Sequence, residues 1–257
     1  MNNKSKTHIL ISGASKGLGA ALAIAWSLRL RDELHLSLIA TSVDNLENTR
    51  QACIRNGSKV NVYALDITNY AANSALIKQI DQTQPINIAV LNSGVSGNSS
   101  KGIEPFNQAH HIINTNLTGT LSCASTVAEL MLQKGTGKIV FINSISAFRS
   151  LPLTPSYCAS KAGLKAYTDA LRAYLTPHNI SVISIHPGFI DTDMSKNFKG
   201  PKPFITTAQK MSAVIITAIE KNRAVLIYPR MLGAAHRCLN ILPARIADKL
   251  LIWLGYG

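Results

Sequence analysis

Tyr157 and Lys161 lie four positions apart, and Ser144 lies thirteen residues before Tyr157. Side chains four positions apart project from one face of a helix. A nearby ammonium stabilises a phenolate, so we expect Lys161 to lower the pKa of Tyr157 from its ordinary value of about 10. Such a tyrosine can act as a general acid or base near neutral pH. Because short patterns also occur on ordinary solvated helices, this interpretation depends on the rest of the chain.

A glycine-rich turn follows the first predicted strand, residues 8–12. The turn reads Gly13-Ala14-Ser15-Lys16-Gly17-Leu18-Gly19 and leads into an Ala/Leu-rich helical segment that ends near residue 30. Glycines let the backbone approach a ligand closely, and the helix N-terminus presents free N–H groups. A strand, turn and helix in this order predict a pyrophosphate site, although such a turn can also serve packing alone.

Further motifs follow in order along the chain: Ser12-Gly13 through Gly19, Asp66-Ile67, Asn92-Ser93-Gly94, Asn116, Ser144, Tyr157 with Lys161, and Pro187-Gly188. Together they resemble the short-chain dehydrogenase/reductase family of the single-domain type, over nearly the whole chain. Ser12 stands where threonine is commoner in that family, and Ser93 where alanine is. Both are small residues, and neither is expected to touch the chemistry.

Apolar segments alternate with helical patterns, as in a doubly wound parallel sheet. The predicted strands cover residues 8–12, 34–40, 59–65, 86–91, 137–143, 180–186 and 224–228. The predicted helices cover about 17–30, 44–55, 69–82, 107–133, 155–177 and 206–221. We therefore expect an α/β fold of Rossmann type, a mostly seven-stranded parallel sheet with helices on both faces, in one catalytic domain over residues 1–257.

The resemblance implies hydride transfer between a nicotinamide cofactor and a carbonyl or secondary alcohol. Tyr157 would donate a proton to the carbonyl oxygen, and Ser144 would hydrogen-bond that oxygen. Lys161 would keep the tyrosine acidic and bind the nicotinamide ribose. Asn116 resembles the asparagine that holds a water in the proton relay, with Asn114 as its alternative.

Two neighbouring residues offer competing interpretations. Ser146 is an alternative to Ser144, and a helix-cap role would suit either serine, but the offset of thirteen residues to Tyr157 selects Ser144. His186 lies at a strand end beside a proline, where a structural role is expected in preference to a catalytic one.

The end of the second predicted strand bears on the choice of cofactor. It reads Ala40-Thr41-Ser42, and no acid follows until Asp44. An acid there commonly binds the 2′-hydroxyl of NAD and would repel the 2′-phosphate of NADP. By resemblance Lys16 contacts that phosphate, and Thr41 and Ser42 could donate to it. We therefore favour NADP(H) over NAD(H), unless Lys16 is simply solvated and Thr41 only begins a turn.

The resemblance assigns the other cofactor contacts to loops at strand ends. Asp66 and Ile67 would meet the adenine, Asn92-Ser93-Gly94 a ribose, and Ile190 and Thr192 the carboxamide. No metal site is expected. The complete set of expected cofactor residues is Gly13, Ser15, Lys16, Gly17, Leu18, Gly19, Thr41, Ser42, Asp66, Ile67, Asn92, Ser93, Gly94, Tyr157, Lys161, Pro187, Gly188, Ile190 and Thr192.

Composition agrees with a globular enzyme, since 46% of the 257 residues are hydrophobic and 15% are charged. The four cysteines show no metal-ligand spacing and are expected to be reduced thiols. No signal peptide is expected before the first strand, and no apolar run has the length of a membrane span. These features predict a cytoplasmic protein.

The net charge of +13 is concentrated near the C-terminus, where the last 62 residues hold ten Lys/Arg and two acids. By resemblance, residues 195–206 form a substrate lid. The tail, about residues 231–254, predicts two short amphipathic helices interrupted at Pro243. It could contact an anionic membrane surface, or attract an acidic substrate or acyl-carrier partner. A solvated basic face over a subunit contact is the simpler alternative, and no nucleic acid is expected.

Small residues along the helix that carries Tyr157 suggest an assembly surface. They recur at helical spacing and allow helices to approach closely, so we expect a homo-oligomer, a dimer or tetramer, with packing inside the subunit as the alternative. These residues are Ala159, Ala162, Gly163, Ala166, Ala170 and Ala173.

The sequence therefore predicts an NADP(H)-dependent carbonyl reductase or alcohol dehydrogenase. Residues 187–194 and Ala40-Thr41-Ser42 look similar to bacterial 3-oxoacyl-carrier-protein reductases, which suggests a 3-oxoacyl thioester or a lipid-like ketone as substrate. The basic, apolar tail is not expected of that group. A regulator or scaffold that binds dinucleotide without turnover is the alternative, but it would not need the intact catalytic set.

Overall fold

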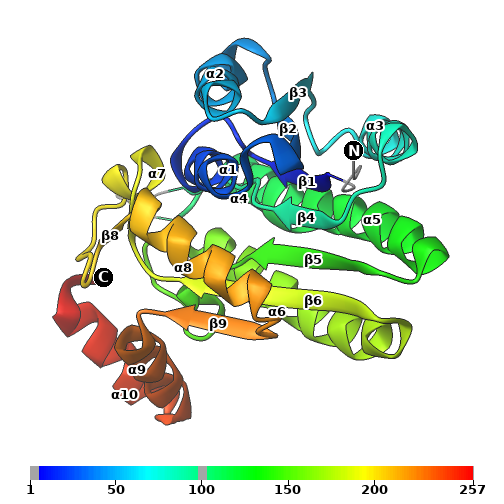
Figure 1. The fold of residues 1–257 in the computed structure, drawn as a ribbon. Coiled ribbons are helices and arrows are strands. Elements are labelled where there is room, and N and C mark those ends of the chain that lie inside the picture. The colour runs from blue at the N-terminus through cyan, green and yellow to red at the C-terminus, as the bar shows by residue number, and fades with distance from the viewer. Residues whose placement is uncertain (1–5, 98–102, 257) are drawn as a thin grey trace.

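The computed structural model describes residues 6–97 and 103–256, and within these ranges seven parallel strands form the main sheet (Figure 1). The strand order is β3-β2-β1-β4-β5-β6-β9. The bounds are β1 (Thr7–Ser12), β2 (Leu34–Ala40), β3 (Lys59–Ala64), β4 (Ile88–Leu91), β5 (Gly137–Ile142), β6 (Ile180–Pro187) and β9 (Val225–Tyr228). The order reverses between β1 and β4, which is where open sheets of this kind bind ligands. The predicted Rossmann-type fold is confirmed.

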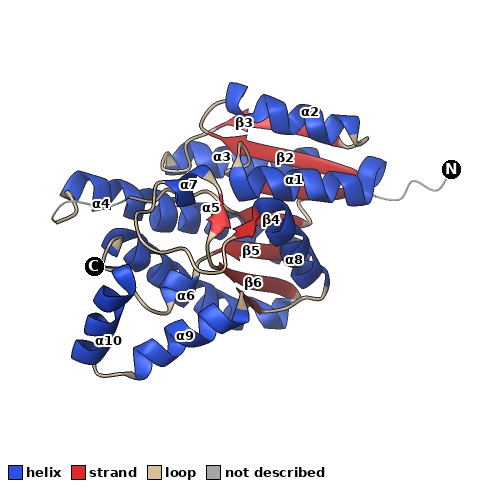
Figure 2. Cartoon of the chain, turned by 90° about the vertical axis from the view of Figure 1, so that its left-hand side faces the viewer, coloured by secondary structure: helices blue, strands red, loops and turns tan. Residues whose placement is uncertain are grey.

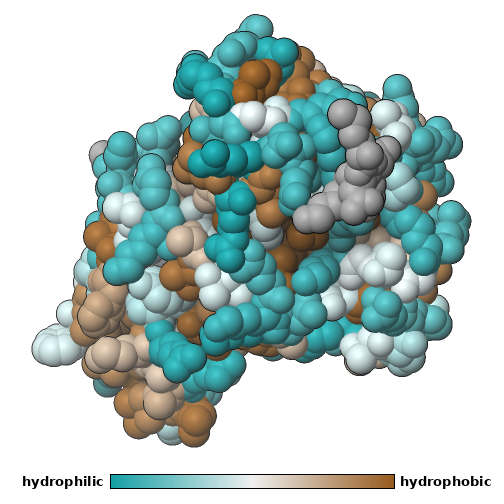
Figure 3. Space-filling view, in the orientation of Figure 1, coloured by the Kyte–Doolittle hydropathy of each residue, from teal (hydrophilic) through white to brown (hydrophobic). Residues whose placement is uncertain are grey.

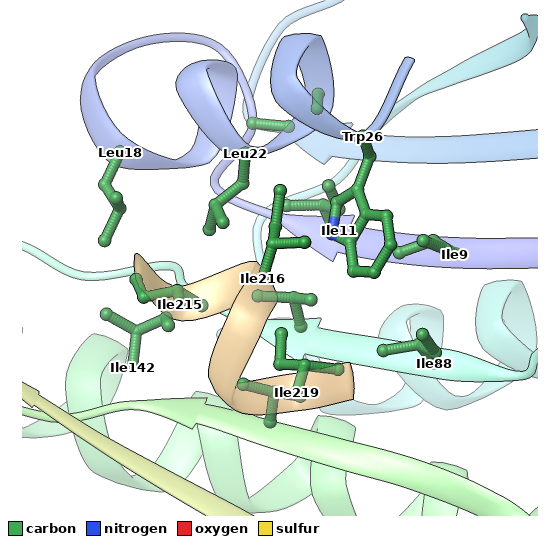
Figure 4. Close-up of a cluster of buried hydrophobic side chains, with 14 of the residues drawn as sticks. Ile9, Ile11, Leu18, Leu22, Trp26, Ile88, Ile142, Ile215, Ile216 and Ile219 are labelled. Atoms are coloured by element: carbon green, nitrogen blue, oxygen red, sulfur yellow. The ribbon is translucent and has the colours of Figure 1, made fainter. Parts of the chain in front are cut away.

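Helices cover both faces of the sheet. On one face lie α1 (Gly17–Leu30), α2 (Glu47–Arg55) and α8 (Ala208–Glu220), and on the other lie α3 (Tyr70–Thr83), α4 (Phe106–Ile113), α5 (Thr120–Lys134) and α6 (Pro155–Leu175). Alternate residues of β1 point to opposite faces, so Ile9 and Ile11 pack in one core and Leu10 in the other. In Figure 4, Leu22 of α1 lies close to Ile216 of α8 in the first core. These two cores hold the strand ends in place.

The expected single helix over residues 107–133 is wrong in one respect. A π-helical turn at Asn114–Gly119 separates α4 from α5 and contains Asn116. The chain stays helical through this wider turn, which is why the sequence pattern reads as one helix. Within this turn, the Asn116 side chain forms hydrogen bonds with the backbone of Val95, in the loop after β4, as described below.

Residues that follow β6 form the lid and the tail. The pair β7 (Ile190–Asp191) and β8 (Thr206–Thr207) frames α7 (Asp193–Lys196), and α8 begins at Ala208 because the Thr207 hydroxyl accepts from the N–H of Lys210. The tail contains α9 (Arg230–Ile241) and α10 (Ala244–Leu251), followed by a π-helical turn at Ile252–Tyr256. Pro243 separates the two helices, as predicted. In the part of the chain that the structure describes, no helix combines the length and apolar character needed to cross a membrane.

Candidate active site

A cavity of about 300 Å³ opens at the carboxyl ends of β1, β4, β5 and β6. Figure 2 looks onto this side of the molecule, with α7 near the centre of the view. The cavity lies at the reversal of strand order, where open α/β sheets bind ligands. Of the expected site residues, those that line it are Gly13, Ser15, Lys16, Gly17, Leu18, Asn92, Gly94, Ser144, Tyr157, Lys161, Pro187, Gly188, Ile190 and Thr192.

The glycine turn has the backbone of a phosphate cradle. Gly13 and Gly17 have φ angles of +65° and +58°, a region that favours glycine. A Cβ atom on Gly19 would lie 2.1 Å from the carbonyl oxygen of Gly13, so only glycine fits there without a shift of the backbone. No side chain caps the first turn of α1, and its N–H groups stay available at the cavity wall. These features fit the pyrophosphate of a dinucleotide cofactor.

Ser12 and Asn92 tie the glycine turn to the loop after β4. The Ser12 hydroxyl oxygen accepts from the N–H groups of Asn92 and Ser93, at 3.0 and 3.1 Å. The Asn92 amide in turn donates to the carbonyls of Ser12 (3.2 Å) and Gly13 (2.9 Å). Ser12, noted in the sequence only as a departure from the family pattern, therefore fixes the cradle.

Ser144, Tyr157 and Lys161 meet on one wall of the cavity. Tyr157 lies in the first turn of α6, where the Ser144 side chain is near enough to act on its pKa. Lys161 is buried one turn later, with Nζ 5.8 Å from the centre of the Tyr157 ring and donating to the carbonyl of Ile142 at 2.9 Å. Ser144 also accepts from the N–H of Ser146, at 3.1 Å. Ser146 lines the cavity too, but Ser144 is the serine whose side chain acts on the pKa of Tyr157.

Asn116 lies behind this wall and does not line the cavity. Its side chain accepts from the N–H of Val95 (2.7 Å) and donates to the carbonyl of Val95 (2.8 Å) and to the Ser160 hydroxyl (3.2 Å). The alternative residue, Asn114, instead accepts from the Tyr70 hydroxyl. Asn116 is therefore the one that contacts α6, and its expected role in a water relay stays a prediction.

The expected electrostatic effect of Lys161 on Tyr157 is wrong in this structure. Burial raises the pKa of Tyr157 to about 12, while the Ser144 side chain acts in the opposite direction. Burial also lowers the pKa of Lys161 to about 8. Both charged forms lose hydration in the enclosed wall, and this loss is the largest cause of each shift. The structure therefore holds Tyr157 as a protonated hydroxyl, the form that can donate a proton.

Several expected cofactor residues lie outside the cavity lining. Thr41 and Ser42 follow β2, with Thr41 exposed, and the Asp66 carboxylate accepts from the N–H of Thr68 at 2.9 Å. Ile67 is buried, with its side chain 3.0 Å from the position of a Cβ atom on Gly119. Gly19, Ser93 and Asn116 likewise do not line the cavity.

The sequence did not single out the residues that make the other wall apolar. Phe189 directly follows the Pro187-Gly188 turn, and its ring centre lies 5.4 Å from that of Phe198 in the lid. In the sequence these residues lie between recognised motifs, and that position was the available signal for them, because no spacing rule selects such side chains. The unpredicted lining includes Leu151, Thr154, Phe189, Met194 and Phe198.

Comparison with known proteins identifies the family of this chain. The family described as short chain dehydrogenase matches residues 7–202. This chain belongs to that family. An uncharacterised oxidoreductase of Myxococcus xanthus is 28% identical over 240 residues, which cover 93% of this chain and 94% of that protein. A 3-oxoacyl-[acyl-carrier-protein] reductase of Synechocystis is 28% identical over 190 residues, which cover 73% of this chain and 76% of that protein.

Solved structures share the fold of this short-chain dehydrogenase. A short-chain dehydrogenase from Sphingobium yanoikuyae in complex with NADPH superposes with a TM-score of 0.78 at 23% identity, covering 93% of this chain and 97% of that one. An NAD+-bound xylitol dehydrogenase superposes with a TM-score of 0.76 at 17% identity, covering 88% of this chain and 98% of that one. The shared fold thus accommodates either cofactor.

Proposed function

We propose that this oxidoreductase transfers a hydride between NADP(H) and the carbonyl or secondary alcohol of an apolar substrate. The observation that carries the proposal is the position of Ser144, Tyr157 and Lys161 on the wall of the same cavity as the glycine cradle. Proton donor and cofactor cradle face one space, as carbonyl reduction requires.

In the proposed reaction, Tyr157 donates its hydroxyl proton to the substrate oxygen as negative charge develops there. The raised pKa of Tyr157 keeps this proton in place until the oxygen becomes more basic. Ser144 would hydrogen-bond the same oxygen, and Lys161 would bind the nicotinamide ribose. A nicotinamide cofactor, held by the glycine turn with Asn92, Gly94, Ile190 and Thr192, would supply the hydride. Asn116 holds the loop after β4 against α6.

The preference for NADP(H) is supported by charge at the entrance of the cradle. The Lys16 side chain is 75% exposed, and its ammonium lies 3.4 Å from the Asp193 carboxylate. An exposed ion pair of this kind contributes little, so Lys16 is free to reach a phosphate. No acid follows β2 before Asp44 to repel that phosphate.

The proposed substrate class is a lipid-like ketone, with 3-oxoacyl thioesters as the first candidates. The apolar side chains of Leu151, Phe189 and Phe198 line the same cavity as Tyr157. They suit an acyl or other hydrocarbon chain attached to the carbonyl. The Synechocystis relative is named as a reductase of this class.

We further propose a homo-oligomer that uses the outer side of α6. Ala159, Ala162, Ala166, Ala170 and Ala173 are exposed there, while Gly163 faces Leu117 inside the subunit. Exposed small residues let a helix of a second copy approach closely. The single catalytic domain and the cytoplasmic location stay predictions.

Cofactor titration tests the binding half of the proposal. We expect NADPH to bind more tightly than NADH, followed by NADPH oxidation with one class of a panel of ketones and 3-oxoacyl thioesters. Tighter NADH binding contradicts the cofactor preference. Binding of either cofactor without turnover of any panel member favours a dinucleotide-binding regulator over an enzyme.

A further inference from the structure

The C-terminal tail exposes an unusual concentration of apolar side chains. Of the eighteen large hydrophobic side chains that are exposed in the described residues, seven lie within residues 231–254. Figure 3 shows hydrophobic surface gathered at the lower left of the molecule, over α9 and α10. We call this the tail surface, and its members are Met231, Ile241, Leu242, Ile246, Ile252, Trp253 and Leu254.

The two tail helices present this surface through their helical spacing. On α9, Met231, Cys238 and Ile241 are exposed on one side, while Leu232 and His236 are buried. Ile241 is 83% exposed, so the protein itself does not cover this side. A helix with apolar residues on its outer side has an unpartnered face.

Basic residues lie beside the apolar side chains on α10. Ile246 and Leu250 lie one turn apart, with Trp253 less than one turn further, and Arg245 and Lys249 form an adjacent row. Ile246 is 56% exposed and Trp253 is 78% exposed, while Ala247 and Leu251 face the protein. A helix with an apolar row, a flanking basic row and an aromatic residue fits the boundary between lipid headgroups and acyl chains.

Charge favours an anionic lipid surface over a second copy of this chain. From Arg230 to Tyr256 there are four Lys/Arg and one acid, Asp248. Asp248 is already paired with Arg149, at 2.5 Å. A symmetric contact between two tail surfaces would bring these basic residues together, whereas lipid phosphates would neutralise them.

We propose that the tail surface docks onto an anionic membrane surface. Ile246, Leu250 and Trp253 enter the acyl boundary, and Arg245 and Lys249 bind lipid phosphates. The tail is part of the cavity surroundings, so docking brings the cavity wall to the lipid. This inference does not depend on the proposed chemistry.

The tail packs against the lid, which supports the inference that docking brings the cavity wall to the lipid. The Tyr256 ring lies 6.3 Å from the Phe198 ring, which lines the cavity. Leu251 packs in the same cluster as Leu151, another lining residue. A lipid-like ketone partitioned in the membrane would therefore have a short route to Tyr157.

Vesicle sedimentation of the full-length protein tests the proposal. We expect the protein to sediment with vesicles of phosphatidylcholine and phosphatidylglycerol in equal parts, to remain free with phosphatidylcholine alone, and to be released by high salt. Trp253 fluorescence should shift to shorter wavelength on anionic vesicles, since the other tryptophan, Trp26, is already buried.

Matched variants separate the effect of the tail surface on vesicle binding from the effects of the protein's total charge and hydrophobicity. The double variant R245E/K249E should bind anionic vesicles more weakly by at least about 25-fold, since each cation lost costs about fivefold. R55E/K78E makes the same charge change on α2 and α3 and should bind as the parent does. I246S/W253S should lose insertion, whereas L28S/I54S, at exposed positions on α1 and α2, should keep it.

Failure to bind anionic vesicles at low salt overturns the proposal, as does an equal loss in R55E/K78E. Loss of self-association in I246S/W253S without loss of vesicle binding also overturns it. Binding of an acidic acyl-carrier protein in place of vesicles would assign the tail surface to a protein partner. Turnover of a water-soluble ketone is measured in parallel, so that failed docking and failed catalysis are distinguished.

Discussion

Nδ1 of His186 lies 3.0 Å from the backbone carbonyl oxygen of Ser144. A carbonyl only accepts, so Nδ1 carries the hydrogen. Nε2 lies 2.8 Å from the Ser184 hydroxyl oxygen and accepts the hydrogen of that hydroxyl. The ring is buried, with its centre 4.7 Å from that of Phe148. His186 does not line the cavity, and β6 thereby fixes the backbone of the serine that meets Tyr157. It is a positioning residue.

Replacing His186 with leucine should lower kcat by about tenfold, the effect of one lost hydrogen bond on the position of Ser144. The KM for cofactor should change little, because His186 is separate from the glycine cradle. His186→Asn can donate in place of Nδ1 and should recover part of the rate. Steady-state kinetics well below the unfolding temperature measure both constants. An equal loss in both variants, with KM raised, would contradict a positioning role.

Acid should destabilise the fold between pH 6.5 and about 4. Burial lowers the pKa of both His8 and His186 from 6.5 to about 4. In this window the unfolded chain binds more protons than the folded one, so stability falls as pH falls through it. Each shift corresponds to roughly 3 kcal/mol when complete. Thermal unfolding from pH 7 to pH 4 measures the slope.

The double variant H8N/H186N should show a shallower acid slope than the parent. His178→Asn, at an exposed position after α6, is the matched control and should leave the slope unchanged. An unfolding temperature that stays constant from pH 7 to pH 4 in the parent would disprove this account of the two buried imidazoles.

Lys16→Ala should weaken NADPH binding by about tenfold and leave NADH binding nearly unchanged, since only NADPH carries the 2′-phosphate. Thr41→Asp should act in the same direction by adding a charge that repels that phosphate. Fluorescence titration measures both affinities, with Lys78→Ala as the control at a distant exposed lysine. Equal weakening of NADPH and NADH by Lys16→Ala would assign Lys16 a different contact.

Gly19→Ala should abolish cofactor binding, because its Cβ atom would lie 2.1 Å from the carbonyl oxygen of Gly13 and force the cradle apart. Gly135→Ala tests a glycine with φ of +66° and open space around it. That control should cost about 1 kcal/mol of stability and leave binding intact. Titration and thermal unfolding of both variants separate the two effects. Normal binding by Gly19→Ala would show that the cradle yields easily.

The sequence predicts the sheet well because buried parallel strands leave nearly continuous apolar runs, as in β4 and β5. It places Ser144, Tyr157 and Lys161 together because their spacing is fixed by β5 and α6. The pKa of Tyr157 was predicted wrongly, since desolvation depends on how the walls close. Phe189 and Phe198 were missed because their contact joins a strand-end turn to a lid, and no local period encodes it.

The most direct test of the account is turnover and NADPH affinity in Tyr157→Phe, which removes only the hydroxyl. We predict a fall in kcat of at least about a thousandfold for the panel ketone that the parent reduces best, together with NADPH affinity within about twofold of the parent. Ser144→Ala should follow the same pattern with a smaller loss. Turnover in Tyr157→Phe close to that of the parent would contradict the proposal that Tyr157 donates the proton.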